Sequence, residues 1–343
     1  MRTLEFWLLY GLSLVFSLAA LGCLTLLFCS GQMWLRESQT VEEAAPVTGK
    51  FVQARDAKMF VFEEGRDTDP AVVLIHGMGA WGGLWGETAD PLAGADFRPI
   101  TIDLPPFGIS QKLYGADNYT VDKQAQRILD VLDNLGVKKA VLVCHSVGCR
   151  PTMEAAMLRP GLAQKLVLVD PALGFADDKA NPHFEQNHAG GLLRTFFSMK
   201  FIRNAALATY GTHPFSVPSI FRSFVYNRAA VNAGRIELMT YPLNINGITN
   251  AYGDWMEHLF IAQEAAYTAN FANFKVLGMP SLIFWGRQDT LTPLWQGEAL
   301  QKMLPAATLK VVDNCGHIPY LEQTDGFNAL LLKFLQNKPL DGE

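Results

Sequence analysis

The sequence predicts a protein of the α/β class, with a mostly parallel sheet and a helix ahead of it that crosses a membrane. Two observations carry this prediction. Short apolar runs alternate with amphipathic stretches through much of the 343-residue chain, as in proteins whose parallel strands are covered by helices. Before that alternation begins, no charged residue occurs between Glu5 and Arg36.

The first segment is apolar enough to form a membrane anchor. Residues 6–29 are almost wholly apolar, and as a helix they would extend about 36 Å, which matches a bilayer core crossed at a tilt. Trp7, Tyr10 and Trp34 lie near the ends, where aromatic belts occur. We expect an uncleaved transmembrane anchor over residues 1–30. A cleaved signal peptide and a buried helix of a soluble protein are the alternatives.

The charges around this segment give little information about its orientation. Arg2 and the terminal amine favour a cytoplasmic N-terminus, while Arg36 on the far side is followed by several glutamates. We expect a single pass that leaves the catalytic domain on the outer, periplasmic or lumenal side. Residues 31–49, which contain Pro46 and Gly49, are expected to form a linker.

From residue 50 onward the chain alternates between strand and helix patterns. An antiparallel pair is expected first, at 50–54 and 59–63. Further strands are expected at 71–75, 99–102, 140–143, 166–169, 280–285 and 308–312. Amphipathic helices are expected at 119–135, with Thr120 as N-cap, and at 326–336.

The alternation stops between two of these strands. Residues 172–275 carry helical patterns and many aromatic side chains, with few strand signals. A helical insertion at this place predicts a cap over the carboxyl ends of the strands, where parallel sheets bind ligands. The core is then expected to consist of residues 50–171 and 276–343.

The stretch Cys144-His145-Ser146-Val147-Gly148 follows an apolar run and precedes a helical pattern. A serine on a sharp strand-to-helix turn is how one class of enzymes exposes a nucleophile, with the pattern G-x-S-x-G. Only the second glycine of that pattern is present, so the prediction depends on partners elsewhere in the chain.

Two such partners follow later strands. Asp289 and His317 occur after Ser146 in the order that hydrolases of this sheet type use. A serine hydroxyl needs a base to take its proton, which His317 would do, and an acid fixes the imidazole tautomer and stabilises the imidazolium. We expect Asp289 to be that acid, with Asp170 at the end of an earlier strand as the alternative.

The tetrahedral intermediate of such a reaction needs preorganised N–H donors. We expect one from Val147, directly after the nucleophile. The other is expected from Met78 in the loop His76-Gly77-Met78-Gly79, whose glycines allow close approach of the backbone.

These motifs, taken together with residues 103–110, 285–289 and 316–317, resemble the α/β-hydrolase fold family, in particular its capped, lipase/esterase-like serine hydrolases. The resemblance covers roughly residues 50–337. It implies an eight-stranded sheet with a helical cap inserted after the sixth strand. With its apolar N-terminal segment, the chain is similar in layout to membrane-anchored monoacylglycerol lipase-like enzymes.

Several further residues lie close to the predicted site. Trp81, Trp85 and Phe107 are possible pocket-wall residues. The five cysteines do not indicate a disulfide scaffold, and we expect Cys144, Cys149 and Cys315 to be small buried apolar side chains.

The predicted function is a membrane-anchored serine hydrolase that cleaves carboxylic esters, with lipid esters as candidate substrates, through an acyl-enzyme. The alternatives are a C–C bond hydrolase, an acyltransferase or a perhydrolase with the same triad, or a non-catalytic binding protein. Epoxide hydrolases and haloalkane dehalogenases are disfavoured because they use aspartate where this chain has Ser146. We expect no cofactor, no metal and, with a net charge of −5, no nucleic-acid partner.

Overall fold

The computed structural model describes residues 2–176, 183, 190–261 and 265–340. Its centre is one eight-stranded sheet with the order β1-β2-β4-β3-β5-β6-β7-β8, which confirms the predicted α/β class and the mostly parallel sheet. The β1–β2 and β2–β4 pairs are antiparallel and the remaining pairs are parallel. The strands are β1 (Gly49–Gln53), β2 (Lys58–Glu63), β3 (Ala71–Ile75), β4 (Arg98–Ile102), β5 (Ala140–His145), β6 (Ala163–Val169), β7 (Ser281–Gly286) and β8 (Ala307–Val312).

The central strands are apolar throughout because helices cover both faces of the sheet. Along β3, Val73 and Ile75 point into one core cluster while Val72 and Leu74 point into the other. Helices α3 (Val121–Asn134), α4 (Cys149–Leu158) and α10 (Trp295–Met303) contribute to the first cluster. Helices α2 (Gly86–Ala93), α11 (Pro319–Glu322) and α12 (Thr324–Leu335) contribute to the second.

The predicted helical insertion lies between β6 and β7, and its described part contains α5 (Gly191–Ser198), α6 (Lys200–Ala206), α7 (Val217–Phe224), α8 (Ala233–Thr240) and α9 (Ile248–Ile261). A π-helical turn, η4 (Leu207–Gly211), continues α6. We call residues 190–261 the cap. A buried cluster that includes Phe107, Tyr119 and Trp255 joins α9 of the cap to loops of the core.

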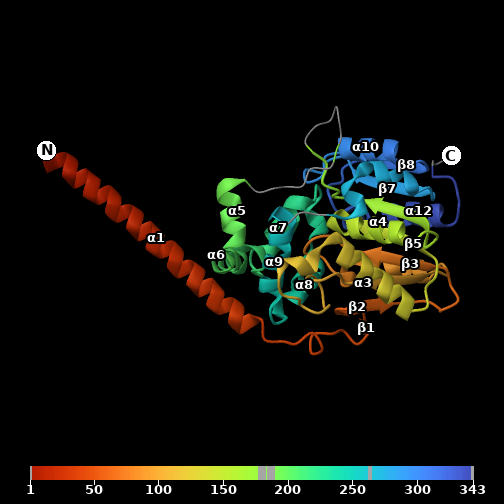
Figure 1. The fold of residues 1–343 in the computed structure, drawn as a ribbon, viewed down its shortest axis with the longest axis horizontal. Helices are drawn as coiled ribbons and strands as arrows, with labels where there is room; N and C mark the ends of the chain where they lie inside the picture. The colour runs from red at the N-terminus through yellow and green to blue at the C-terminus, as the bar shows by residue number, and fades with distance from the viewer. Residues whose placement is uncertain (1, 177–182, 184–189, 262–264, 341–343) are drawn as a thin grey trace.

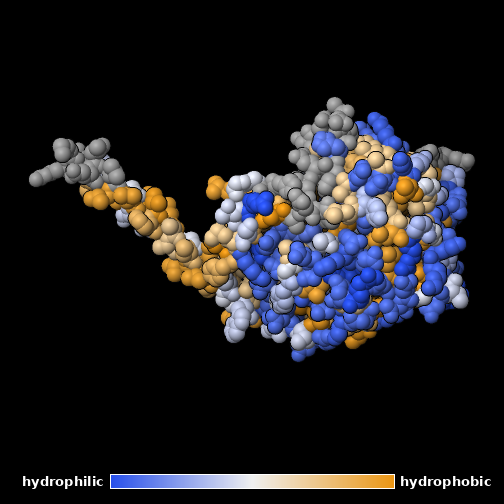
Figure 2. Space-filling model, viewed as in Figure 1, coloured by the Kyte–Doolittle hydropathy of each residue, from blue (hydrophilic) through white to orange (hydrophobic). Residues whose placement is uncertain are grey.

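Helix α1 (Arg2–Arg36) projects from the domain and has a mostly apolar, exposed surface (Figures 1 and 2). Among the described residues it is the one helix long and apolar enough to cross a membrane. The helix continues to Arg36, beyond residue 30 where the anchor was expected to end, because Gln32 to Arg36 are ordinary helix formers. The predicted linker therefore begins after Arg36.

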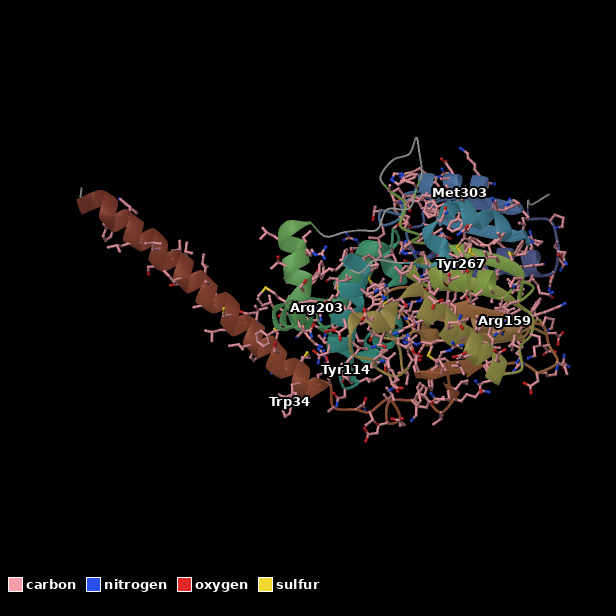
Figure 3. The ribbon with its side chains drawn as sticks, viewed as in Figure 1. Trp34, Tyr114, Arg159, Arg203, Tyr267 and Met303 are labelled. Atoms are coloured by element: carbon pink, nitrogen blue, oxygen red, sulfur yellow. A yellow bond between two sulfur atoms is a disulfide. The ribbon has the colours of Figure 1, made fainter. Side chains whose placement is uncertain are left out.

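The last turns of α1 lie against the cap, where they contact α6 and η4. Arg36 Nε donates to the Leu243 carbonyl at 3.0 Å, and the guanidinium pairs with Glu37 at 3.1 Å. The buried Glu37 carboxylate accepts from Thr249, whose hydroxyl lies 2.6 Å from that of Thr212. This polar chain fixes the end of α1 to the cap. Figure 3 labels Trp34, near that end of α1, and Arg203 of the cap.

Candidate active site

Ser146 lies directly after β5 and has the backbone conformation of a nucleophile on a sharp turn. Its φ is +51°, a left-handed value that is uncommon for a residue other than glycine. A Cβ on Gly148 would lie 2.2 Å from the carbonyl oxygen of His76, so the turn requires glycine at that position. The turn therefore forms although Cys144 replaces the first glycine of the usual pattern.

The structure brings Ser146, His317 and Asp289 into one hydrogen-bonded chain. Ser146 Oγ lies 2.8 Å from His317 Nε2, and His317 Nδ1 lies 2.7 Å from Asp289 Oδ2. All three residues are buried and follow strands β5, β7 and β8, whose carboxyl ends share one edge of the sheet. This arrangement lets His317 accept the serine proton while Asp289 holds the imidazole in the required tautomer.

Asp289 is held as a carboxylate by its surroundings. Burial raises the pKa of this carboxyl, but the hydrogen bonds from His317 and Thr292 outweigh burial and hold its pKa below the ordinary value. The N–H groups of Leu291 and Thr292 donate to Oδ1 at 2.7 and 3.0 Å. The group beside His317 is therefore charged and cannot rotate freely.

Asp170, the alternative acid, lies next to this pair without a hydrogen bond to His317 among the described interactions. Its Oδ1 accepts from the Gly286 N–H at 2.9 Å. Burial, and then the negative charge of Asp289, raise its pKa well above the ordinary value. The geometry therefore favours Asp289 as the triad acid, because Asp289 is hydrogen-bonded to His317 whereas Asp170 accepts from the Gly286 N–H.

Asp170, Asp289 and His317 place possible ligand atoms within 4.8 Å of one another, which is also the composition of a small metal site. These residues fit a metal poorly. Nδ1 of His317 already lies 2.7 Å from Asp289, and burial raises the pKa of Asp170, which disfavours the carboxylate form that would bind a metal. We therefore assign these three residues to the proton transfers of the triad rather than to a metal site.

The loop of the predicted oxyanion hole is held by His76. Its Nε2 accepts the N–H of Leu104 at 2.9 Å, so Nδ1 carries the proton and donates to the Gly77 carbonyl at 2.8 Å. Burial lowers the pKa of His76 to about 4, which keeps this tautomer neutral. Met78 and Val147, the predicted oxyanion donors, both border the cavity above Ser146.

His145 is a second buried neutral histidine, and it positions the base. Its Nε2 donates to the carbonyl of His317 at 2.8 Å, and Tyr320 packs against its ring. Burial, and then the nearby His317, lower the pKa of His145 to about 3.

Ser146 and His317 line a cavity of about 390 Å³, within the usual size range of ligand sites. The walls are mainly apolar and come from both core and cap, including Phe107, Leu104, Phe221, Trp255, Met256 and Leu259. Arg150, one turn beyond the nucleophile, supplies a cationic side chain to the same wall. None of the cap residues was predicted individually, because the sequence does not show which cap aromatics face inward.

Two predicted pocket-wall residues lie elsewhere. Trp85 is fully buried in the core, where it stacks on Tyr320 with ring centroids 4.0 Å apart. Trp81 stacks on Tyr241 and donates from Nε1 to the Leu238 carbonyl at 2.8 Å. Both side chains therefore join the loop to its neighbours, and the prediction that they line the pocket is wrong.

The prediction for the cysteines is also wrong in part. Cys144 and Cys149 form a disulfide, with Cα atoms 4.9 Å apart, while Cys315 is buried and free. This pair was not predicted, because the two cysteines meet only through the turn after β5, and their spacing in the sequence does not show that contact. The turn after β5 brings the two side chains to the same side of Ser146.

The chain belongs to the α/β hydrolase fold family, whose model matches residues 70–324. It is therefore an enzyme of the hydrolase class. A 2-hydroxy-6-oxononadienedioate/2-hydroxy-6-oxononatrienedioate hydrolase of Pseudomonas putida is 25% identical, over 87% of this chain and 100% of that protein. A 2-hydroxy-6-oxo-6-phenylhexa-2,4-dienoate hydrolase of Burkholderia cepacia is 26% identical, over 86% of this chain and 99% of its own length.

Solved structures share the fold at lower identity. The enol-lactonase of Burkholderia xenovorans LB400 has a TM-score of 0.66 at 17% identity, and the match covers 84% of this chain and 100% of that one. A bacterial membrane phospholipase A has a TM-score of 0.65 at 19% identity, and it covers 96% of this chain and 97% of its own. Only about 14 residues of this chain lie outside the second match, so it includes much of α1.

Proposed function

We propose that this hydrolase forms an acyl-enzyme on Ser146 from an apolar carbonyl substrate. The Ser146–His317–Asp289 hydrogen-bonded chain beside an apolar cavity carries the proposal. Ser146 Oγ attacks the carbonyl carbon while His317 Nε2 takes its proton. The oxyanion accepts from the N–H groups of Met78 and Val147.

The intermediate then collapses and the leaving group departs with the proton from His317. Water, deprotonated by His317, attacks the acyl carbon and releases the acid and free Ser146. Asp289 stabilises the imidazolium in both halves of the reaction. The leaving group is an alkoxide in ester cleavage and a carbanion in C–C cleavage.

The curated relatives favour C–C cleavage over ester cleavage. Several of them are named as hydrolases of 2-hydroxy-6-oxo-dienoates or dienedioates. In such a substrate the 2-hydroxyl proton is first transferred to C5, which gives a vinylogous diketone. The carbanion that then departs at C5 is delocalised onto the C2 carbonyl, which makes it a feasible leaving group. A carboxylate on that part of the substrate would suit the guanidinium of Arg150 in the cavity wall.

A lipid ester is the second candidate, and the N-terminal helix favours it. Helix α1 is long enough to hold the domain at a membrane, and the match to the membrane phospholipase extends into it. The mainly apolar cavity suits an acyl chain. We propose that α1 anchors the enzyme in a membrane as a single pass. The Cys144–Cys149 disulfide supports placing the domain in an oxidising compartment on the outer side.

A fluorophosphonate probe followed by a substrate panel tests the proposal. We expect the probe to label wild-type protein and not the Ser146→Ala variant, with all turnover lost in the variant. Unchanged turnover in Ser146→Ala would refute the acyl-enzyme mechanism. The panel compares 2-hydroxy-6-oxo-6-phenylhexa-2,4-dienoate with acylglycerols, and the substrate class with the higher kcat/KM identifies the leaving group.

A further inference from the structure

A second cavity, of about 380 Å³, lies within the cap next to the first. The two cavities share four lining residues, Met78, Phe221, Phe224 and Met256. Met78 is the predicted oxyanion donor, so the second cavity adjoins the place where the substrate carbonyl would bind. A substrate bound at Ser146 is therefore next to both cavities, which these four residues separate.

The wall of the second cavity is suited to an apolar ligand. Phe197, Leu207, Val217, Met239 and Leu243 all line it. Its one cationic side chain, Arg203, is buried and already satisfied: Nη2 donates to Asp254 at 2.7 Å, Nη1 donates to the Phe197 carbonyl at 2.9 Å, and Glu257 accepts a further bond. The Thr212 hydroxyl is likewise within 2.6 Å of Thr249. These polar groups therefore have no need of a polar ligand.

The outer wall of this cavity faces α1. Ala206, Leu207, Tyr210 and Gly211 belong to the end of α6 and to η4, which the last turns of α1 contact. In α1, Cys29 is buried and Met33 is half-buried, on the face that meets the cap. The second cavity therefore lies between α1 and the catalytic loops, since its walls include residues of α6 and η4 on one side and Met78 on the other. Figure 1 shows α6 between α1 and the core.

The length of α1 places this part of the cap at the membrane surface. The uncharged residues 6–35 would extend about 45 Å, whereas a bilayer core is about 30 Å thick. About ten residues are left over, which matches the turns that contact the cap. Beside them, α5 and α6 expose large apolar side chains to solvent, namely Leu192, Leu193, Phe201 and Ile202. Such a surface is typical of segments that lie at the boundary of headgroups and acyl chains.

We propose that the second cavity binds a long acyl or alkyl chain of a membrane lipid ester. The chain enters from the bilayer beside α1, while the ester lies at Ser146 and the rest of the substrate occupies the first cavity. This inference rests on the lipid-ester candidate for the function. It adds that the enzyme has separate sites for two apolar arms of its substrate.

Filling the second cavity tests the inference. Ala206→Trp adds a large side chain to its wall, and Ala229→Trp, on the exposed surface of the cap, is the matched control. We measure kcat/KM of the full chain for p-nitrophenyl butyrate and p-nitrophenyl palmitate. We expect Ala206→Trp to lower the palmitate value by about tenfold or more, because several methylene groups lose their site. The butyrate value should change by less than about twofold, and Ala229→Trp should change neither.

An equal effect on both esters, or no effect on palmitate, would overturn the inference. If Ala206→Trp also loses fluorophosphonate labelling, it has misfolded, and Ile220→Trp in the same cavity decides instead. Wild-type protein that hydrolyses neither ester refutes the lipid-ester function itself, which is a different result.

The source of the chain is tested with a diacylglycerol in phosphatidylcholine vesicles. We expect the same selective loss of turnover in Ala206→Trp. A loss confined to esters dissolved in water would refute entry from the bilayer.

Discussion

Two carboxyl groups lie beside His317, and their pKa values are shifted in opposite directions. Asp289 is 2.7 Å from Nδ1 and its pKa is held low by the hydrogen bonds it accepts, whereas burial and then the charge of Asp289 raise the pKa of Asp170. The pKa of Asp170 therefore depends in part on the charge of Asp289. Removing that charge lowers the pKa of Asp170 and favours its carboxylate form.

This dependence leads to a prediction for three variants. Asp289→Asn should lower kcat by about 10³-fold, since the imidazole loses its partner and correct tautomer. Asp170→Asn should lower kcat by less than about fivefold. The double variant should be at least about tenfold worse than Asp289→Asn alone, because Asp170 can then no longer replace the lost charge. These kcat values are measured by steady-state kinetics on the substrate that the wild-type enzyme turns over.

Asp313→Asn, at an exposed ion pair with Arg287, is the matched control and should be neutral. A greater loss in Asp170→Asn than in Asp289→Asn would contradict the assignment of the acid.

Among individual residues, those that directly follow strands were predicted well from the sequence. Ser146, Asp289 and His317 could be predicted to meet, because parallel strands bring their carboxyl ends to one edge of the sheet. Trp81 and Trp85 could not be placed, because they lie in a loop whose path decides which side chains face the cavity. Their partners, Tyr241 and Tyr320, lie more than a hundred residues away in the sequence.

Among the secondary-structure elements, the turn between β5 and α4 is constrained by a disulfide. The Cys144–Cys149 disulfide closes a loop that contains Ser146. For a loop this short, the chain-entropy model gives a stabilisation of about 2 kcal/mol.

We therefore predict that a Cys144→Ala/Cys149→Ala variant loses about 2 kcal/mol of unfolding free energy, measured by urea unfolding in detergent. Adding dithiothreitol should destabilise the wild type and leave this variant unchanged. Cys23→Ser removes a free, exposed cysteine and should have no effect. Equal stability of wild type and double variant under oxidising conditions would show that the disulfide does not form in solution.

The strands and long helices were easier to predict than the cap. The core strands are continuous apolar runs, and α3 has a clear amphipathic pattern with Thr120 Oγ1 accepting from Lys123 N at its start. The cap helices α5 to α8 have only seven or eight residues each. Such short helices depend on tertiary contacts, which local patterns do not reveal.

For the whole molecule, α1 and the catalytic domain are joined by a defined contact. Deleting residues 2–25 removes most of the exposed apolar length and keeps the turns that contact the cap. We predict that this variant leaves the membrane fraction yet keeps fluorophosphonate labelling, because the triad lies in the core. Labelling and fractionation of the same sample measure both. A truncated protein that still sediments with membranes would show that α1 is not the main anchor.

Acid stability should depend on the two buried histidines. His76 and His145 have pKa values lowered to about 4 and about 3, while both would titrate near 6.5 when unfolded. Between about pH 6 and pH 4 the unfolded chain binds these protons and the folded chain does not. The histidines therefore stabilise the fold above pH 6.5, and this contribution is lost as the pH falls.

We predict that His145→Gln reduces the slope of unfolding free energy against pH by about 1.4 kcal/mol per pH unit in this window, since one proton is removed from the difference. Asp170 makes the opposite contribution, because its raised pKa favours the folded state as the pH falls. Both proteins contain Asp170, so its contribution cancels when the slope of the variant is subtracted from that of the wild type. His213→Gln, a partly exposed position on the cap, is the control. Parallel slopes for wild type and His145→Gln would refute a neutral His145.

The contact between α1 and the cap also sets an order for biosynthesis. Arg36 and Glu37 are bound by Leu243 and Thr249, which follow them by more than 200 residues. When α1 leaves the ribosome, the groups that hold its end have not yet been translated. Docking of the helix onto the enzyme can therefore occur only after most of the chain has been synthesised. In the membrane-anchored enzyme that we propose, insertion of α1 precedes this docking.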